Sequence, residues 1–136
     1  MEGKERMTHE SRDGRTYASE LDNKLLERIA LVVVGIDVIE TLSIKRPNWI
    51  SSFDRTGVWV ETERSRARRS GPQRVPAWML VVAWDQLCKN GSLSQIELLN
   101  DLNVKRSAIV CALLAKFPDV VVLQNRPTVL ERIAHS

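Results

Sequence analysis

Cysteine and histidine are scarce in this chain of 136 residues, which contains two of each. Cys88 and Cys111 lie in apolar stretches that predict helices, where a free thiol usually packs as a small hydrophobic group. A disulfide framework needs more cysteines, and His9 and His135 lie near opposite ends of the chain, away from any metal-site spacing. We therefore expect two reduced, buried thiols and no metal ion or other cofactor.

Long hydrophobic runs are also missing. The longest run, residues 29–36, has eight residues including Gly35, whereas a membrane-spanning helix needs about 20. The first 16 residues are charged and lack the apolar core of a signal peptide. These absences predict a cytoplasmic protein with no membrane partner. Residues 1–17 have no apolar periodicity, and we expect a disordered tail there.

Acidic residues are absent from residues 64–74, although the whole chain has a net charge of only +3. This stretch contains five arginines: Arg64, Arg66, Arg68, Arg69 and Arg74. Guanidinium groups bind phosphates through paired hydrogen bonds, so a local concentration of them indicates nucleic-acid contact. The Gly71-Pro72 pair argues against regular structure and predicts a basic linker loop over residues 64–74. The alternative interpretation is an ordinary solvated linker.

Apolar periodicity predicts a helix followed by strands in residues 18–63. Ser19 is placed to cap a helix whose apolar stripe includes Leu21, Leu25 and Ile29, with Gly35 as its stop. Residues 38–43, 48–53 and 58–62 are rich in strand formers, and residues 54–57 form a turn. We expect an N-terminal helix and a small antiparallel β-meander.

Residues 75–136 follow a different order of elements. Pro76 opens a helix that ends at Gly91, and a capping box from Ser94 to Glu97 starts a second helix. A third helix is expected over residues 105–117, and strands over residues 120–123 and 128–133 form a hairpin. This order predicts a winged helix-turn-helix. The expected fold class is therefore α+β, with the N-terminal helix and small antiparallel β-meander packed on a C-terminal winged helix-turn-helix.

The third helix in such a fold often lies in the major groove of DNA, with the wing against the backbone. We therefore expect Lys105, Arg106 and Ser107 at the groove and Arg126, at the wing tip, on the backbone. Residues 108–115 contain no polar side chain to read bases, so this helix either contacts DNA only through its first turn or packs on the meander or another subunit. The alternative function is a protein-interaction or oligomerisation module, for example a homodimer, that uses this apolar helix and the apolar helix expected over residues 21–34.

Aromatic and acidic residues admit two further hypotheses. Core packing is the favoured interpretation of the four tryptophans, although Trp49 and Trp59 on an exposed sheet face would stack on unpaired bases. Asp54, Glu61 and Glu63 suggest a metal-dependent nuclease, but the lysine that such a core needs is missing after Glu61. With no Ser/His/Asp set and no glycine-rich phosphate loop, we expect a non-catalytic protein.

A resemblance to known families supports the DNA hypothesis. Residues 104–108, with residues 112–115 and Pro118, resemble winged-helix domains of bacteria. Residues 58–65 followed by Val75-Pro76 are similar to accessory DNA-binding modules of bacterial restriction and DNA-defence proteins, and the resemblance covers residues 39–130. It implies a small DNA-contacting module without catalytic residues of its own. We expect double-stranded DNA as the partner, with a homodimer or a larger protein complex as the alternative protein partners.

Overall fold

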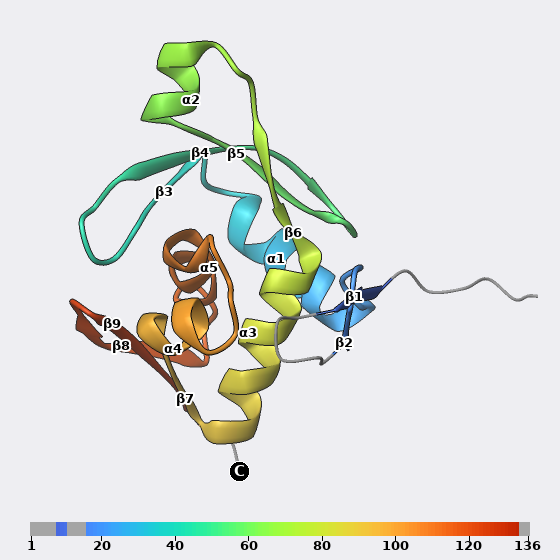
Figure 1. Ribbon diagram of the computed structural model, residues 1–136, viewed down its shortest axis with the longest axis vertical. Helices are drawn as coiled ribbons and strands as arrows, with labels where there is room; N and C mark the ends of the chain where they lie inside the picture. The colour runs from blue at the N-terminus through green and yellow to red at the C-terminus, as the bar shows by residue number, and fades with distance from the viewer. Residues whose placement is uncertain (1–7, 11–15, 134–136) are drawn as a thin grey trace, which may run out of the picture.

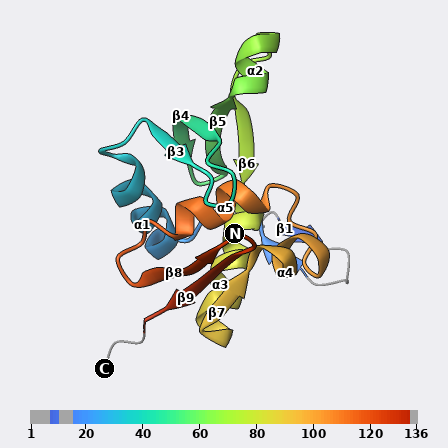
Figure 2. The same cartoon turned by 90° about the vertical axis from the view of Figure 1, so that its left-hand side faces the viewer.

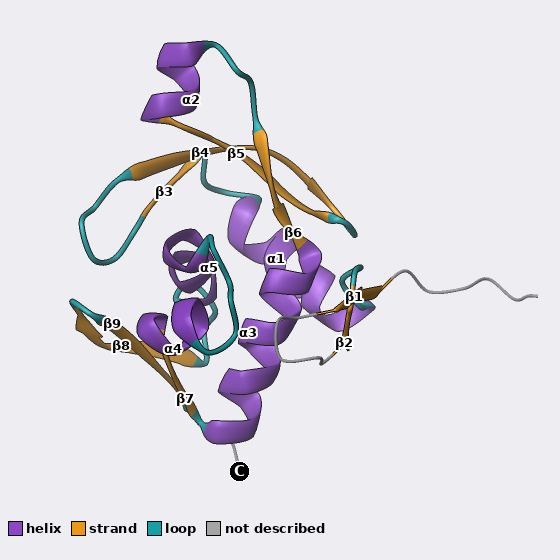
Figure 3. Ribbon diagram, viewed as in Figure 1, coloured by secondary structure: helices purple, strands orange, loops and turns teal. Residues whose placement is uncertain are grey.

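The computed structural model describes residues 8–10 and 16–133, which form a mixed α+β fold with antiparallel sheets. These residues contain five helices and nine strands. A four-stranded sheet lies on one side of the helix α5 and a three-stranded sheet on the other (Figures 1 and 3). The α+β class expected from the sequence is confirmed.

A short hairpin precedes the first helix. Strands β1 (Thr8–Glu10) and β2 (Thr16–Ala18) pair antiparallel, where the sequence predicted a disordered tail. That prediction is wrong for these two strands, and its remaining residues, 1–7 and 11–15, lie outside the described part of the chain. Strand β2 pairs with β1 and also contacts α3. The apolar periodicity of the sequence does not reveal such contacts between separate segments.

Helix α1 (Asn23–Val33) begins later than the sequence predicts. Asp22, not Ser19, caps it by accepting a hydrogen bond from the amide of Leu25 at 2.8 Å. Leu21, the residue before this cap, is held by the sheet instead, because its amide donates to the carbonyl of Arg55 in the turn between β4 and β5. The expected apolar stripe is confirmed, with Leu25 and Ile29 buried against the core.

The predicted meander is present and has four strands. They are β3 (Val38–Glu40), β4 (Pro47–Asp54), β5 (Gly57–Thr62) and β6 (Gln73–Pro76), hydrogen-bonded in that order and all antiparallel. Val58 and Val60 of β5 and Val75 of β6 are fully buried, so they define the face of the sheet that covers the core.

Helix α2 (Glu63–Arg68) occupies much of the stretch predicted to be an irregular basic linker, and that prediction is wrong there. The cause is a reciprocal cap that we did not recognise in the sequence. The Thr62 side chain accepts from the Ser65 amide at 3.0 Å, and the Ser65 hydroxyl accepts from the Thr62 amide at 2.8 Å. Arg69 ends the helix in the left-handed conformation, and β6 begins after Gly71-Pro72.

The remaining elements follow the predicted order with one added strand. They are α3 (Ala77–Asn90), β7 (Ser92–Ser94), α4 (Gln95–Asn100), α5 (Ser107–Leu114), β8 (Val120–Asn125) and β9 (Thr128–Arg132). Strand β7 was not expected; it pairs with β9 and gives the sheet order β7-β9-β8. Only half of the expected capping box forms, because Ser94 accepts from the Glu97 amide while the Glu97 carboxylate accepts from Gln86.

Helix α5 lies at the centre of the molecule (Figures 1 and 2). It is shorter than the predicted residues 105–117, since Arg106 caps it and its last turn ends at Leu114. Every residue from Ile109 to Leu114 is buried, and the helix contacts α3, α4 and β3. One hydrophobic cluster therefore runs from α1 through the four-stranded sheet to β9.

Gly57 is a position where only glycine fits. Its φ is +149°, and an added Cβ would overlap the carbonyl oxygen of Val75 on the neighbouring strand. We expect Gly57→Ala to lower the free energy of unfolding by about 2 kcal/mol or more, because it forces an unfavourable φ and separates β5 from β6. Urea unfolding followed by fluorescence measures the change.

Gly35→Ala is the matched control, because nothing lies within 4 Å of a Cβ there and its φ is not positive. It should be neutral or stabilise the protein by up to about 1 kcal/mol. Equal unfolding midpoints for the two variants would contradict the strand geometry described at Gly57.

Candidate functional site

Four of the five arginines expected to contact phosphate lie together on or directly after α2, and all four are exposed: Arg64, Arg66, Arg68 and Arg69. The helix projects from the four-stranded sheet, away from α5 (Figures 1 and 2). With other described residues, the side chains of Arg64, Arg68 and Arg69 form no hydrogen bond or ion pair, so their donors face solvent. These three charges, together with Arg66, make a concentrated positive surface, although Glu63 lies in the first turn of the same helix.

Arg66 is held differently from its neighbours. Its guanidinium lies over the ring of Trp49, 3.7 Å from the ring centroid, and its Nε donates to Glu61 Oε1 at 3.2 Å. Stacking on an indole and pairing with a carboxylate restrict the side chain to one orientation. Arg66 therefore joins α2 to the sheet beneath it.

The sheet face turned away from the core carries both tryptophans of β4 and β5. Trp59 lies between the buried Val58 and Val60, so it points to the opposite face, and Trp49 pairs with Glu61 on that same face. Arg74 of β6 pairs directly with Trp59, with its guanidinium carbon 6.0 Å from the ring centroid. Core packing, the interpretation favoured from the sequence, is wrong for Trp49 and Trp59.

The other two tryptophans do follow the core interpretation. Trp78 and Trp84 of α3 are half-buried and pack against the hydrophobic cluster. The outward direction of Trp59 had a sequence signal that we did not use. In the alternating run Val58-Trp59-Val60, burying both valines leaves the tryptophan on the other face.

The start of α5 does not present the three side chains expected at a groove. Ser107 is buried, with only 3% of its surface exposed, which is a correction to its expected contact with DNA. Arg106 donates to Gln73 Oε1 of β6 at 2.7 Å, and Lys105 is exposed beside it. The structure thus connects Arg106 to the strand that carries Arg74, while the rest of α5 is covered by its own chain.

Arg126 belongs to a separate contact. It lies in the turn between β8 and β9, and its Nη2 donates to the carbonyl of Ser43 in the loop between β3 and β4 at 3.3 Å. In Figure 1 the hairpin of β8 and β9 lies on the other side of the four-stranded sheet from α2. Arg126 therefore does not extend the cluster of arginines on α2.

The acidic residues considered for a nuclease are not brought together. Asp54 accepts from the Thr56 hydroxyl at 2.6 Å and from the Thr56 amide at 2.7 Å, and these hydrogen bonds lower the pKa of its carboxyl. Glu61 lies four residues beyond Gly57, the partner of Asp54, which is roughly 13 Å at the rise of a strand. Residues 8–10 and 16–133 contain no group of three His, Cys, Asp or Glu side chains arranged to hold a metal ion.

A charged cluster that the sequence analysis missed lies around Asp119. Its carboxylate, only 5% exposed, accepts from Arg28 Nη1 at 2.8 Å and from Arg132 Nε at 3.0 Å. These hydrogen bonds, that from Arg28 first, lower the pKa of Asp119 to about 2 against the opposing effect of burial. Both guanidinium groups also lie over Trp84, at 4.5 and 5.0 Å from its ring centroid. The cluster thus joins α1, α3 and β9, and it borders a cavity of about 700 Å³.

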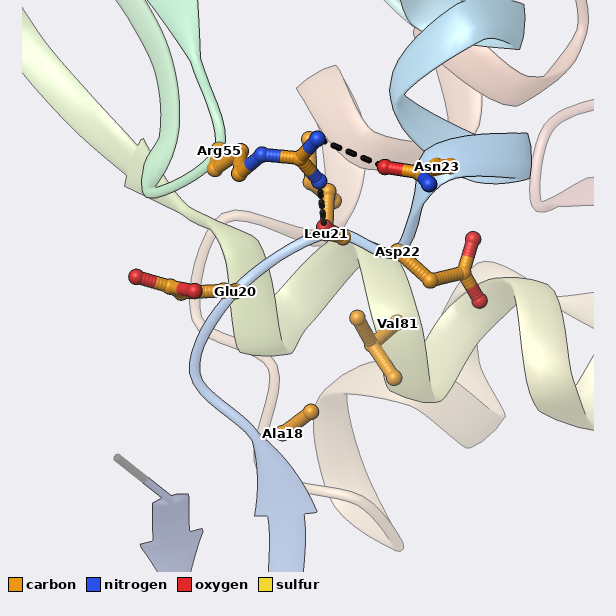
Figure 4. A pocket seen from close by; sticks show the side chains of 7 residues that line it. All are labelled: Ala18, Glu20, Leu21, Asp22, Asn23, Arg55 and Val81. Carbon is orange, nitrogen blue, oxygen red and sulfur yellow. Dashed lines mark hydrogen bonds between the residues drawn. The ribbon is translucent and has the colours of Figure 1, made fainter. Parts of the chain in front are cut away.

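A smaller cavity of about 310 Å³ lies where the turn between β4 and β5 meets the start of α1 (Figure 4). Arg55 reaches across it and donates to the carbonyl of Leu21 at 3.2 Å and to Asn23 Oδ1 at 2.6 Å. Asp22, also at its edge, is used as the cap of α1. The polar groups of this cavity therefore hold the helix to the sheet.

The two cysteines differ in their surroundings, and both are free. Cys111 is buried as expected, and burial raises its pKa to about 12. Cys88 is exposed, which corrects the expectation of a buried thiol, and it accepts from Arg132 Nη1 at 3.3 Å. Neither is arranged as an activated nucleophile.

No helix in the described part of the chain has the length and apolar character needed to cross a bilayer. Comparison with protein-family models, curated proteins and solved structures gave no match. The site residues are therefore defined by their own geometry and chemistry.

The Asp119 cluster makes a pH-dependent prediction. Because the pKa of folded Asp119 lies below its ordinary value of 3.8, its stabilising effect is complete above pH 3.8 and is lost as the pH falls toward 2. The difference between these values corresponds to roughly 2 kcal/mol. We expect Asp119→Asn to destabilise the protein by about that amount at pH 7, with the difference from wild type shrinking below pH 4.

Urea unfolding of both proteins between pH 7 and pH 2.5 measures this difference, within the acid range given by the two pKa values. Asp85→Asn is the control, because Asp85 is 46% exposed and pairs with Lys89 on the helix surface, a contact worth under about 1 kcal/mol. If the loss of unfolding free energy in Asp119→Asn stayed constant down to the lowest pH, the ion pairs described for Asp119 would be contradicted.

Proposed function

We propose that this chain is a non-catalytic nucleic-acid-binding protein that contacts phosphates through α2 and β6. The proposal depends on the exposed arginines on and directly after α2. Of these, only Arg66 forms an ion pair with a described acidic residue, Glu61. The positive charges of these arginines repel one another because they are close together. Phosphates bound between the arginines would offset this repulsion with attractive contacts. Arg74 extends this positive surface onto the outer face of β6, where it pairs with Trp59.

The arrangement of α3, β7, α4, α5, β8 and β9 supports the winged-helix hypothesis. A helix, a strand, two helices and a hairpin follow one another, and the first strand pairs with the last in the sheet order β7-β9-β8. In the proposed function this unit supports the basic surface and does not read the major groove, because β3 covers α5 and Ser107 is buried.

The interaction-module alternative depended on two apolar helices, α5 and the N-terminal helix expected over residues 21–34. The apolar character of α5 is explained by packing within the chain, since α5 contacts α3, α4 and β3. On the N-terminal helix, Leu25 and Ile29 are buried by the same chain, and Leu31 and Val34 remain exposed. The nucleic-acid hypothesis is therefore the better supported of the two.

The test is a titration of labelled duplex and single-stranded nucleic acid at increasing salt, measured by fluorescence anisotropy. We expect the triple variant R64A/R68A/R69A to bind more weakly to every sequence. Each lost phosphate contact lowers the slope of log affinity against log salt by about 0.7 to 0.9, so the slope should fall by about 2 to 3.

The matched control is K24A/K89A/K116A, which removes the same charge from exposed positions on α1, at the end of α3 and after α5. It should change the salt slope by less than about 1. An equal loss in both triple variants would indicate a nonspecific effect of net charge. Absence of binding to any nucleic acid at the lowest salt would overturn the proposed function.

A further inference from the structure

We propose that the outer face of the four-stranded sheet binds single-stranded nucleic acid, with an unpaired base stacked on Trp59 and the backbone directed toward α2. This inference rests on the proposed function and names its ligand. It starts from the position of Trp59, which the strand alternation turns away from the fully buried Val58 and Val60.

Trp59 is the more open of the two aromatic rings on this face. Arg66 lies directly over Trp49, with 3.7 Å between the guanidinium carbon and the ring centroid. The corresponding separation between Arg74 and Trp59 is 6.0 Å, at the outer limit of a cation–π contact. A planar base would stack on Trp59 by displacing Arg74 from this looser contact, and Arg74 would then pair with a neighbouring phosphate.

The two tryptophans lie close enough to act on one strand. Trp49 pairs with Glu61, and Trp59 is two residues from Glu61 on the same strand and face. Such diagonal neighbours on adjacent strands are about 7 to 8 Å apart. Aromatic side chains on neighbouring strands of a sheet are the arrangement that lets a protein stack two or three bases of a single strand.

The charges around the rings fit an extended backbone. Arg74 lies on the sheet itself, and the exposed arginines of α2 lie beyond Trp49, where Arg66 contacts it. Phosphates of a strand crossing from Trp59 toward Trp49 would approach α2. The acids on this face are Glu40 of β3, Asp54 of β4 and Glu61 of β5. Glu61 is already paired with Arg66, and Asp54 is hydrogen-bonded to Thr56 and interacts with the charge of Arg74.

A duplex does not use these features. Its bases are stacked on one another, so their faces are not available to the indole of Trp59, which is half-buried on this outer face. The helix that would enter a major groove, α5, is covered by β3. Unpaired bases are therefore the ligand that uses the aromatic and the basic parts of this surface together.

The test measures the affinity of the full chain for three labelled ligands by fluorescence anisotropy. They are a mixed-sequence single DNA strand of about 16 nucleotides, the RNA of the same sequence and the matching duplex. We expect either single strand to bind more tightly than the duplex. Trp59→Ala should weaken single-strand binding by about 5- to 150-fold and leave the weaker duplex binding unchanged.

A second variant, Trp59→Leu, keeps an apolar side chain of substantial volume but removes the aromatic face. It covers the case in which Trp59→Ala fails to fold, and it should lose single-strand affinity to a similar extent. Leu31→Ala is the control, since Leu31 is 72% exposed on α1, and it should bind as wild type.

The outcomes separate this inference from the proposed function. Equal or tighter binding to the duplex, or single-strand binding unchanged in folded Trp59→Leu while R64A/R68A/R69A is impaired, would overturn the stacking site and leave the proposed function standing. Absence of binding to all three ligands at the lowest salt would overturn both.

Discussion

Helix α5 is apolar on all sides, and the other elements are arranged to cover it. A helix without a polar face is stable in water only when it is surrounded, and each exposed aliphatic side chain would forgo about 1.5 to 3 kcal/mol of burial. Helices α3 and α4 cover part of α5, and β3 brings the four-stranded sheet against the rest. The N-terminal helix and sheet are therefore joined to the C-terminal elements by one continuous core.

Covering α5 with the sheet decides which surfaces remain available. The valines of β5 and β6 face the core, and the alternation of the strands then sends Trp59 and Arg74 to the outside. Along the chain, α2 lies between β5 and β6. The cap formed by Thr62 and Ser65 begins this helix at the end of β5, at the edge of the outer face. The cations and the outward-facing tryptophans consequently meet on the sheet, whereas Ser107, at the start of α5 where we expected a DNA contact, is buried.

The Asp119 cluster connects the periphery of this core. Arg28 of α1 and Arg132 of β9 share one carboxylate and lie over the same ring, Trp84 of α3. A buried carboxylate is tolerated because two cationic donors compensate for its loss of water. Arg28 and Asp119 are 91 positions apart in the chain, so no local pattern indicated their contact.

Much of the local structure was determined by the sequence alone. The apolar stripe of α1, the turn before Gly57, the end of α3 at Gly91 and the cap at Ser94 all depend on residues within one or two turns of each other. Such signals are legible because the atoms that interact are neighbours in the chain. The basic composition of residues 64–74 was equally evident, although the helix that presents it was missed.

Tertiary structure alone decided the geometry of the candidate site. Which face of the sheet is covered, that Ser107 is enclosed, and that Arg66 lies over Trp49 depend on contacts between segments distant in sequence. A strand specifies two faces but not which one meets the core, because that choice is made by the free energy of burying the whole sheet against α5. The sequence thus determined the elements and their charges, and packing around one apolar helix decided which side chains remain exposed to a ligand.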